Sequence, residues 1–189
     1  MTETLPPDPP APDAIEPITG WRAWNLRRQH GTFQIAPAIQ RPSWTPPDPV
    51  HAVCLASMDR HRAPERTCTC GVYAMSRPDL LMLANRVALT LCVVGSVALW
   101  GKVIEHEMGY RAEFAYPQRM RLVCPRCLWD GRPSVPDRVY EAQGGVWIAA
   151  CVEHGPMWEL RSLPAVQVQQ RLLAGYGVEV LPIEFLRRG

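Results

Sequence analysis

Short runs of alternating apolar and polar residues dominate the chain and predict antiparallel β-strands. Residues 91–105 alternate loosely, with Gly95 and Gly101 among them, and indicate one or two strands bent at a glycine. Residues 120–123 lead from this central region into the segment that begins at Cys124. The remaining β-prone runs are residues 21–26, 32–35, 111–116, 138–142, 146–150 and 178–183, with turns expected at 27–31, 108–110 and 143–145.

Two segments have the spacing and the boundaries of helices. Ser76 precedes Pro78 and Asp79, which predicts an N-cap followed by a first turn. The apolar stripe that follows predicts a helix ending within 86–89. A second helix is expected from Ser162 to about Ala174, with a stop at Gly175. Together these patterns predict an α+β fold: small antiparallel hairpins or a sheet, with two short helices.

Proline punctuates the first quarter of the chain. The sequence holds 20 prolines, and residues 1–17 combine them with acids and almost no large apolar side chain. Such a segment cannot bury enough surface to offset its ordering entropy, so we expect a disordered tail. Residues 36–49 form another proline-rich connection, with Trp44 as its expected anchor. The predicted organisation is a tail at 1–17, a domain at 18–123, a zinc ribbon at 124–160, and a C-terminal helix and strand at 161–189.

The ribbon is predicted from two pairs of soft metal ligands. Cys124 and Cys127 have two residues between them, and so do Cys151 and His154. This spacing lets both members of a pair reach one tetrahedral zinc ion. The expected hairpin lies between the two pairs, in the order of a zinc ribbon. We call these four residues the second cluster.

A first cluster is predicted upstream. Cys54, His61, Cys68 and Cys70 can complete another tetrahedral site, with His51 as an alternative to His61. The C-x-C spacing is less usual than C-x2-C, and Gly71 would open the turn behind it. Partly buried free thiols are the alternative interpretation. The two clusters use six of the 7 cysteines, which leaves Cys92 in an apolar run as a small core residue.

Three segments resemble a family of small proteins from actinobacteria and their phages. They are residues 17–24, 68–74 and 99–117, and the resemblance extends over roughly residues 17–123. It implies that Cys54, His61, Cys68 and Cys70 belong to one pattern. It implies no activity, and the segment from Cys124 onward lies outside it.

The net charge and the lengths of the apolar runs argue against two classes of protein, those dedicated to polyanions and those that span a membrane. The net charge is only +2, which argues against a protein dedicated to polyanions. The longest apolar run, residues 87–100, is shorter than the roughly 20 residues of a membrane span. No basic start or apolar leader is visible at the N-terminus, so we expect a cytoplasmic protein whose cysteines bind metal rather than pair.

Catalytic interpretations are weaker than a structural one. A nucleobase deaminase would place a His or Cys with a Glu before a Pro-Cys-x-x-Cys motif, whereas here the order of the pieces is reversed. Glu105, His106 and Glu107 form a dense polar cluster in which His106 would be a general base, but no nucleophile motif or phosphate loop accompanies it.

The sequence therefore favours a non-catalytic module that binds two Zn²⁺ ions and presents a rigid surface to a protein partner. The alternative is a nucleic-acid-binding zinc ribbon, and an enzyme based on His106 is the third hypothesis. The oligomeric state is left open. In the nucleic-acid hypothesis, four arginines around the pair Cys124 and Cys127 would contact the nucleic acid: Arg119, Arg121, Arg126 and Arg132.

Overall fold

The computed structural model describes residues 16–38, 44–56, 61–82, 90–156 and 160–186. The expected tail at residues 1–17 lies almost wholly outside this part. The described α-helices are α2 (Pro125–Trp129) and α3 (Ala165–Tyr176), and short 3-10 turns occupy Pro78–Leu80, Gln143–Gly145, Val152–His154 and Ile183–Leu186. The strands are β1 (Ile18–Gln29), β2 (Thr32–Ala36), β3 (Val50–His51), β4 (Val72–Met75), β5 (Leu91–His106), β6 (Gly109–Leu122), β7 (Arg138–Glu141), β8 (Val146–Ala150), β9 (Ser162–Pro164) and β10 (Glu179–Val180).

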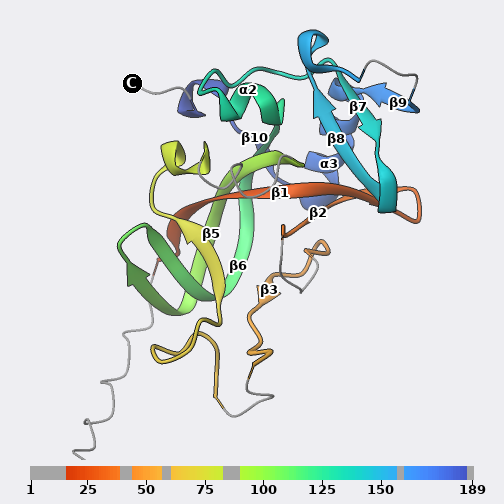
Figure 1. The fold of residues 1–189 in the computed structure, drawn as a ribbon. Helices are drawn as coiled ribbons and strands as arrows, with labels where there is room; N and C mark the ends of the chain where they lie inside the picture. Colours follow the sequence, from red (N-terminus) through yellow and green to blue (C-terminus); the bar gives the residue numbers. More distant parts are fainter. Residues whose placement is uncertain (1–15, 39–43, 57–60, 83–89, 157–159, 187–189) are drawn as a thin grey trace, which may run out of the picture.

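Three long, curved strands form the frame of the molecule (Figure 1). β5 pairs with β1 on one side and with β6 on the other, and both pairings are antiparallel. The β5–β6 register breaks between Trp100 and Val103, beside Gly101 with its φ of 73°, so β5 is one strand bent at a glycine. The pairing of β10 with β6 is parallel. Antiparallel pairing elsewhere in the described sheet, with two α-helices beside it, confirms the predicted α+β class.

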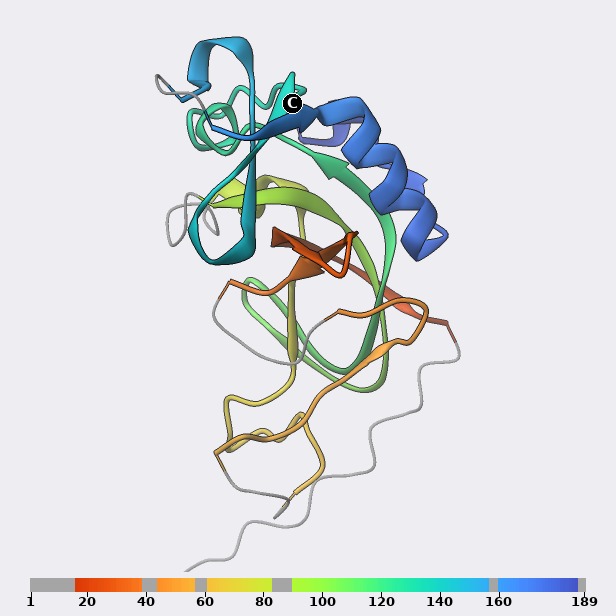
Figure 2. The same ribbon diagram turned by 90° about the vertical axis from the view of Figure 1, so that its right-hand side faces the viewer.

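The two predicted metal-binding regions lie at opposite ends of this frame. The segment around residues 44–71 projects from one end, whereas α2 and the β7–β8 hairpin lie at the other (Figures 1 and 2). The hairpin predicted at 138–150 is present, and β8 also pairs with β1 through Leu26 and Trp147. The second cluster is therefore held against the same sheet that carries the first.

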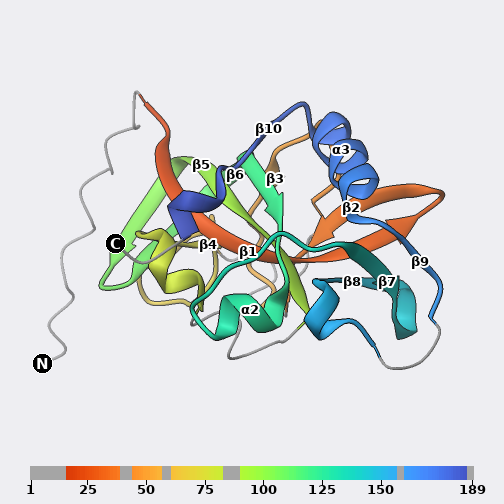
Figure 3. The same ribbon diagram turned by 90° about the horizontal axis from the view of Figure 1, so that it is seen from above.

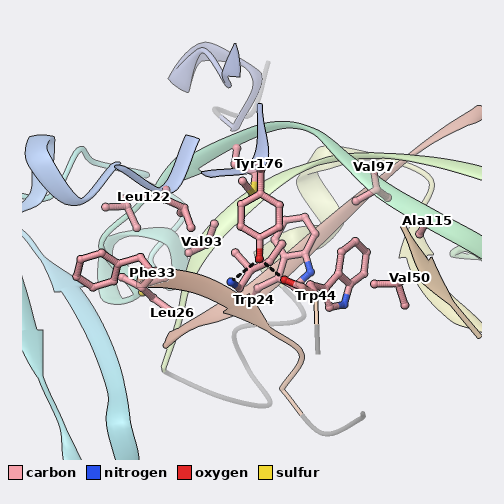
Figure 4. Close-up of a cluster of buried hydrophobic side chains, with 14 of the residues drawn as sticks. Trp24, Leu26, Phe33, Trp44, Val50, Val93, Val97, Ala115, Leu122 and Tyr176 are labelled. Carbon is pink, nitrogen blue, oxygen red and sulfur yellow. Dashed lines mark hydrogen bonds between the residues drawn. The ribbon is translucent and has the colours of Figure 1, made fainter. Parts of the chain in front are cut away.

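Aromatic side chains fill the centre of the main core (Figure 4). Trp24 is fully buried, and its ring meets Trp44 edge to face with the centroids 5.4 Å apart. The Tyr176 hydroxyl accepts a hydrogen bond from the Ile35 amide at 3.1 Å and donates one to the Trp44 carbonyl. Trp44 thus anchors the proline-rich connection, as the sequence indicated. Burial raises the pKa of Tyr176 to about 12, so its hydroxyl stays protonated and keeps donating.

The C-terminal helix differs from its prediction at both ends. Residues 162–164 form β9, which pairs with β7, and α3 starts only at Ala165. The helix runs through Gly175 and ends at Gly177, whose φ of 64° is left-handed. The predicted stop at Gly175 was wrong because Tyr176 is drawn into the core and keeps the last turn helical. α3 lies across β2 and α2 lies beside β8 (Figure 3).

The predicted start of the other helix was also displaced. Arg77, not Ser76, occupies the N-cap position of the Pro78–Leu80 turn. Ser76 instead binds the Met108 carbonyl through its amide and its hydroxyl, which ties it to the β5–β6 turn. The body of that predicted helix, residues 83–89, lies outside the described residues. Within the described part of the chain, no helix is both long and apolar enough to cross a membrane.

Candidate metal centres

The first cluster comes together on the projecting segment. The Sγ atoms of Cys54 and Cys68 are 3.6 Å apart, and His61 Nε2 is 3.3 Å from Cys70 Sγ. All four ligand atoms lie within 4.8 Å of one another. Cys54 is buried, while the other three ligands are partly exposed. His61 belongs to this group, whereas the alternative ligand His51 does not.

Arg111 on β6 holds the loop that carries two of these ligands. Its Nη1 atom donates to the carbonyl oxygens of Cys68 and of Cys70, the latter at 3.1 Å, and to that of Glu65 at 3.2 Å. The Cys68 amide adds a turn bond to the Glu65 carbonyl at 3.1 Å. One guanidinium from the rigid sheet therefore fixes the backbone between the C-x-C ligands.

A buried carboxylate and a lysine fasten the rest of the segment. Glu113 is 2% exposed and accepts from Arg62 Nε at 2.5 Å and from the Lys102 amide at 3.1 Å. Burial alone would raise the pKa of Glu113, but the bond from Arg62 and the other donors hold it below its usual value. Lys102 Nζ reaches Glu65 at 3.1 Å, and this bond lowers the pKa of Glu65. The loop is thus tied to β5 and β6 by charge-assisted bonds.

Gly71 allows the chain to turn back into β4 immediately after Cys70. Its φ is 124°, a conformation that L side chains rarely adopt. A Cβ atom at this position would lie 3.0 Å from the Cβ atoms of both Arg111 and Pro64. The C-x-C pair therefore depends on a glycine that follows it, for steric as well as conformational reasons.

The second cluster is tighter and more deeply buried. His154 Nδ1 lies 3.3 Å from the sulfurs of Cys127 and Cys151 and 3.6 Å from that of Cys124. The Cys127 and Cys151 sulfurs are 3.6 Å apart. The three cysteines are buried, and only the histidine is exposed.

Local structure explains how each pair of the second cluster forms. Cys124 is the N-cap of α2 and Pro125 its first residue, so one helical turn brings Cys127 back beside Cys124. After β8, the turn Val152–His154 is closed by a bond from the His154 amide to the Cys151 carbonyl at 3.1 Å. The Asp137 carboxylate accepts from the Val152 amide at 2.8 Å and steadies this turn.

Both clusters have the dimensions of a tetrahedral site. With zinc–sulfur bonds of about 2.3 Å and zinc–nitrogen bonds of about 2.0 Å, the edges of the tetrahedron are roughly 3.5–3.8 Å. The observed separations of 3.3–3.6 Å between ligand atoms are close to this range. Each cluster supplies three sulfurs and one nitrogen and can hold a metal ion. Four protein ligands leave no position for water, which is the pattern of a structural site.

Thiols packed this closely do not titrate independently. Burial raises the pKa of Cys127 to about 12. Burial also opposes ionisation of Cys151, but bonds from Cys127 and from the backbone amides of His154 and Glu153 bring its pKa down to about 7. Burial raises the pKa of Cys70 in the first cluster. Cysteines bind a metal ion as thiolates, so metal binding must displace protons from both clusters.

Two residues outside the clusters have clear structural roles. Cys92 is fully buried and donates to the Trp147 carbonyl at 3.4 Å, and burial raises its pKa to about 11, as expected of a core thiol. His51 stacks on Phe114 with the ring centroids 4.7 Å apart, and its Nε2 lies 3.6 Å from Glu113. His51 therefore faces Glu113 and not the sulfurs.

The four arginines of the nucleic-acid hypothesis are largely engaged within the chain. Arg119 pairs with Glu179 at 3.4 Å, and Arg126 pairs with Asp130 at 3.8 Å. Arg121 donates to the Leu181 carbonyl, and burial lowers its pKa. Arg132 is exposed. At most part of this group is available to a phosphate backbone.

His106 is exposed at the end of β5, where its ring lies 6.1 Å from that of Tyr73. Within the described ranges, no carboxylate lies within ion-pair distance of its imidazole. The orienting acid required by the general-base hypothesis is therefore not in place there.

The sequence pattern did not connect Arg111, Glu113 or Arg22 with the first cluster, although all three lie beside it. Apart from the Lys102 amide, which is 11 residues from Glu113, their partners lie 41 or more residues away along the chain, so no local spacing could reveal them. The polar cluster at residues 105–107 was visible, but it was considered as a general-base site and not as part of the support of the first cluster. No protein-family model matches the chain, and searches among curated proteins and solved structures gave no match. The resemblance to actinobacterial and phage proteins stays a prediction.

Proposed function

We propose that this chain is a non-catalytic module in which two zinc ions fasten opposite ends of one sheet and hold a rigid surface for a protein partner. The observation that carries the proposal is the pair of complete Cys₃His sets with tetrahedral spacing. Soft thiolates with one imidazole favour zinc over hard cations such as Mg²⁺ or Ca²⁺. A closed site supplies folding free energy rather than chemistry.

The second cluster is proposed to be a zinc ribbon. Each ligand pair sits in a tight turn, and the β7–β8 hairpin separates the two turns. In this arrangement the ion would join the turn at α2 to the turn after β8. The first cluster would do the same for the long segment between β3 and β4.

Exposed apolar side chains near the clusters support a protein partner. Val152, beside Cys151, is 85% exposed, and Trp129, at the end of α2, is 42% exposed. Beside Cys54, Leu55 is 68% exposed. Aromatic and aliphatic side chains held by a rigid scaffold are typical of the centre of a protein interface.

Zinc content is the first test. Native mass spectrometry of protein prepared without chelator should show two zinc ions per chain. Cys68→Ser should remove one ion and Cys124→Ser at least one, while Cys92→Ala should retain both. A folded protein without zinc would refute the proposal, and a single ion would refute one cluster.

The partner is tested separately. A photo-crosslinking amino acid at position 152 should join one defined protein in the cells that naturally contain this chain. The same residue at Val166, which is 62% exposed on α3, is the control. Equal labelling from both positions would contradict a partner surface at the second cluster. Crosslinks to nucleic acid that fall steeply with salt would favour the alternative function.

A further inference from the structure

A cavity lies between the first cluster and β1. Its volume is about 150 Å³, and three of the four residues of the first cluster, Cys54, Cys68 and Cys70, line it. Val53 and Leu55, which also line it, are 53% and 68% exposed and form its rim. The inner wall consists of one arginine, one indole and small apolar side chains: Arg22, Trp44, Val50, Ala52 and Val72.

Among the described residues, Arg22 is the only charged one that lines this cavity. It projects from β1, donates through Nη1 to the Tyr73 carbonyl, and lies over the Trp44 ring with Cζ 5.4 Å from the centroid. Its Nε atom is shielded from solvent and has no hydrogen-bond partner among the described residues. Part of the guanidinium's hydrogen-bonding capacity is thus unused.

No carboxylate of the described residues forms an ion pair with Arg22. Burial lowers its pKa to about 10, which still leaves the group charged at neutral pH. Apart from the thiolates that a zinc-loaded first cluster would present, Arg22 has no counter-charge among the described residues. A partly buried cation of this kind can mark a place where an anion binds. The other large cation beside the first cluster, Arg111, is already committed to the carbonyls of Cys68 and Cys70.

We propose that this cavity binds a monocarboxylate with a small apolar body, with Arg22 as the charge that receives it. A single guanidinium matches a single negative charge and the fork of a carboxylate. The indole and the valine side chains provide no partner for a second charge, which disfavours phosphate. A cavity of this volume, when apolar, accommodates a molecule of about the size of benzene.

Two sources share this chemistry. One is a free small carboxylate. The other is the C-terminus of a protein, whose carboxylate would meet Arg22 while its last side chain, if small and aliphatic, would lie against Val50 and Val72. Recognition of C-terminal carboxylates is a recurrent mode of peptide binding. The second source would also identify the kind of partner in the proposed function, but the cavity itself does not depend on that function.

Binding is tested on full-length protein whose zinc content has been measured. Benzoate is titrated while the indole N–H signal of Trp44 and the methyl signals of Val50 and Val72 are followed by NMR. These signals should shift saturably with benzoate and at least tenfold more weakly with benzamide, which has the same shape without the charge. Arg22→Met should weaken benzoate binding at least tenfold, whereas Arg27→Met, an exposed arginine on the same strand, should change it less than twofold.

A second variant guards against misfolding of Arg22→Met. Ala52→Leu keeps the arginine but fills part of the cavity, so it should also weaken benzoate at least tenfold. Equal binding of benzoate and benzamide would overturn the proposal, and so would unchanged binding by Arg22→Met or phosphate binding tighter than benzoate. If Arg22→Met loses zinc and the zinc-loaded wild type binds no benzoate, then Arg22 balances the metal centre and the proposal is wrong.

Two peptide probes distinguish the sources. A tripeptide ending in valine is compared as its free acid and as its amide. Tighter binding of the acid than of benzoate, with loss in the amide, would support a protein C-terminus. Binding of benzoate alone would support a free small carboxylate.

Discussion

The two clusters offer the same ligand set but are built in different ways. In the second cluster, each pair is formed by a local turn: α2 for Cys124 and Cys127, and the turn after β8 for Cys151 and His154. In the first cluster, the ligands lie on a long excursion between β3 and β4. Their loop is held from outside by Arg111, Lys102 and Glu113 on the sheet.

Burial follows the same division. All three cysteines of the second cluster are buried, whereas only Cys54 is buried in the first. The second cluster joins β8, and through it β1, to the end of β6. We therefore expect loss of the second ion to unfold the whole chain and loss of the first to open one segment. The ligand types therefore determine which metal is favoured, whereas the backbone connections of the ligands determine which part of the fold the metal stabilises.

Cysteine replacement should give the largest contrast. Binding to a structural zinc site contributes on the order of 10 kcal/mol in small zinc peptides, which is comparable with the total stability of a domain, about 5–15 kcal/mol. Cys124→Ser should therefore unfold the chain at 25 °C. Cys68→Ser should lower the melting temperature but leave the strand signal in circular dichroism. A Cys68→Ser variant that unfolds as completely as Cys124→Ser would contradict the proposed difference between the two clusters.

The Arg111 side chain should matter only for the first cluster. Outer-shell partners of metal ligands typically change metal affinity by about 10–100-fold when they are removed. In a chelator competition, Arg111→Met should lower the zinc affinity of the first cluster by this amount and leave that of the second cluster unchanged. Arg121→Met is the matched control, because Arg121 also lies on β6 but donates to Leu181. Equal loss from both sites would mean that Arg111 supports the sheet as a whole.

The two ligand pairs of the second cluster were predictable from sequence because the spacing within each pair is local. Two residues between Cys124 and Cys127 fit one helical turn, and this information lies within the segment itself. The β7–β8 hairpin was predictable for the same reason, since Gly144 and Gly145 both have a positive φ between its strands.

Long-range contacts account for what sequence reasoning missed. Arg111 reaches Cys68, which lies 43 residues away, and Arg22 reaches Tyr73, which lies 51 residues away. The choice between Gly175 and Gly177 as the end of α3 depended on the burial of Tyr176, which only the packed core decides. Ser76 has the residue type of an N-cap, but its preference for Met108 arises from the adjacent hairpin.

The Glu113 carboxylate should make the stability of the segment that carries the first cluster depend on pH. Glu113→Gln removes a charge that accepts from Arg62 and from the Lys102 amide, which should cost about 1–3 kcal/mol at pH 7. The pKa of Glu113 in the folded chain lies below its ordinary value of 4.5, so its contribution is present above pH 4.5 and is lost as the pH falls through the folded pKa.

Urea unfolding of wild type and Glu113→Gln from pH 7 to pH 3 measures this link. The difference between the two proteins should be constant down to about pH 5 and shrink below pH 4.5. Acid also releases zinc, but it does so from both proteins, so this effect largely cancels in the difference between their free energies of unfolding. A difference that does not depend on pH would mean that Glu113 acts through packing and not through its charge.

Replacing a glycine that follows ligands in each cluster should give the smallest differences in stability between the two regions. Gly71 follows the first cluster with a φ of 124°, and Gly131 follows α2 at the second cluster with a φ of 71°. A Cβ at Gly71 would meet Arg111 and Pro64 at 3.0 Å, whereas a Cβ at Gly131 would meet only the Met82 sulfur at 3.6 Å. Gly131→Ala should therefore cost about 1 kcal/mol, which is the conformational term alone. Gly71→Ala should cost about 1–3 kcal/mol and also weaken zinc at the first cluster, because Arg111 has to move. Equal losses of stability, with zinc retained in both variants, would mean that the contacts behind the C-x-C pair do not position its ligands.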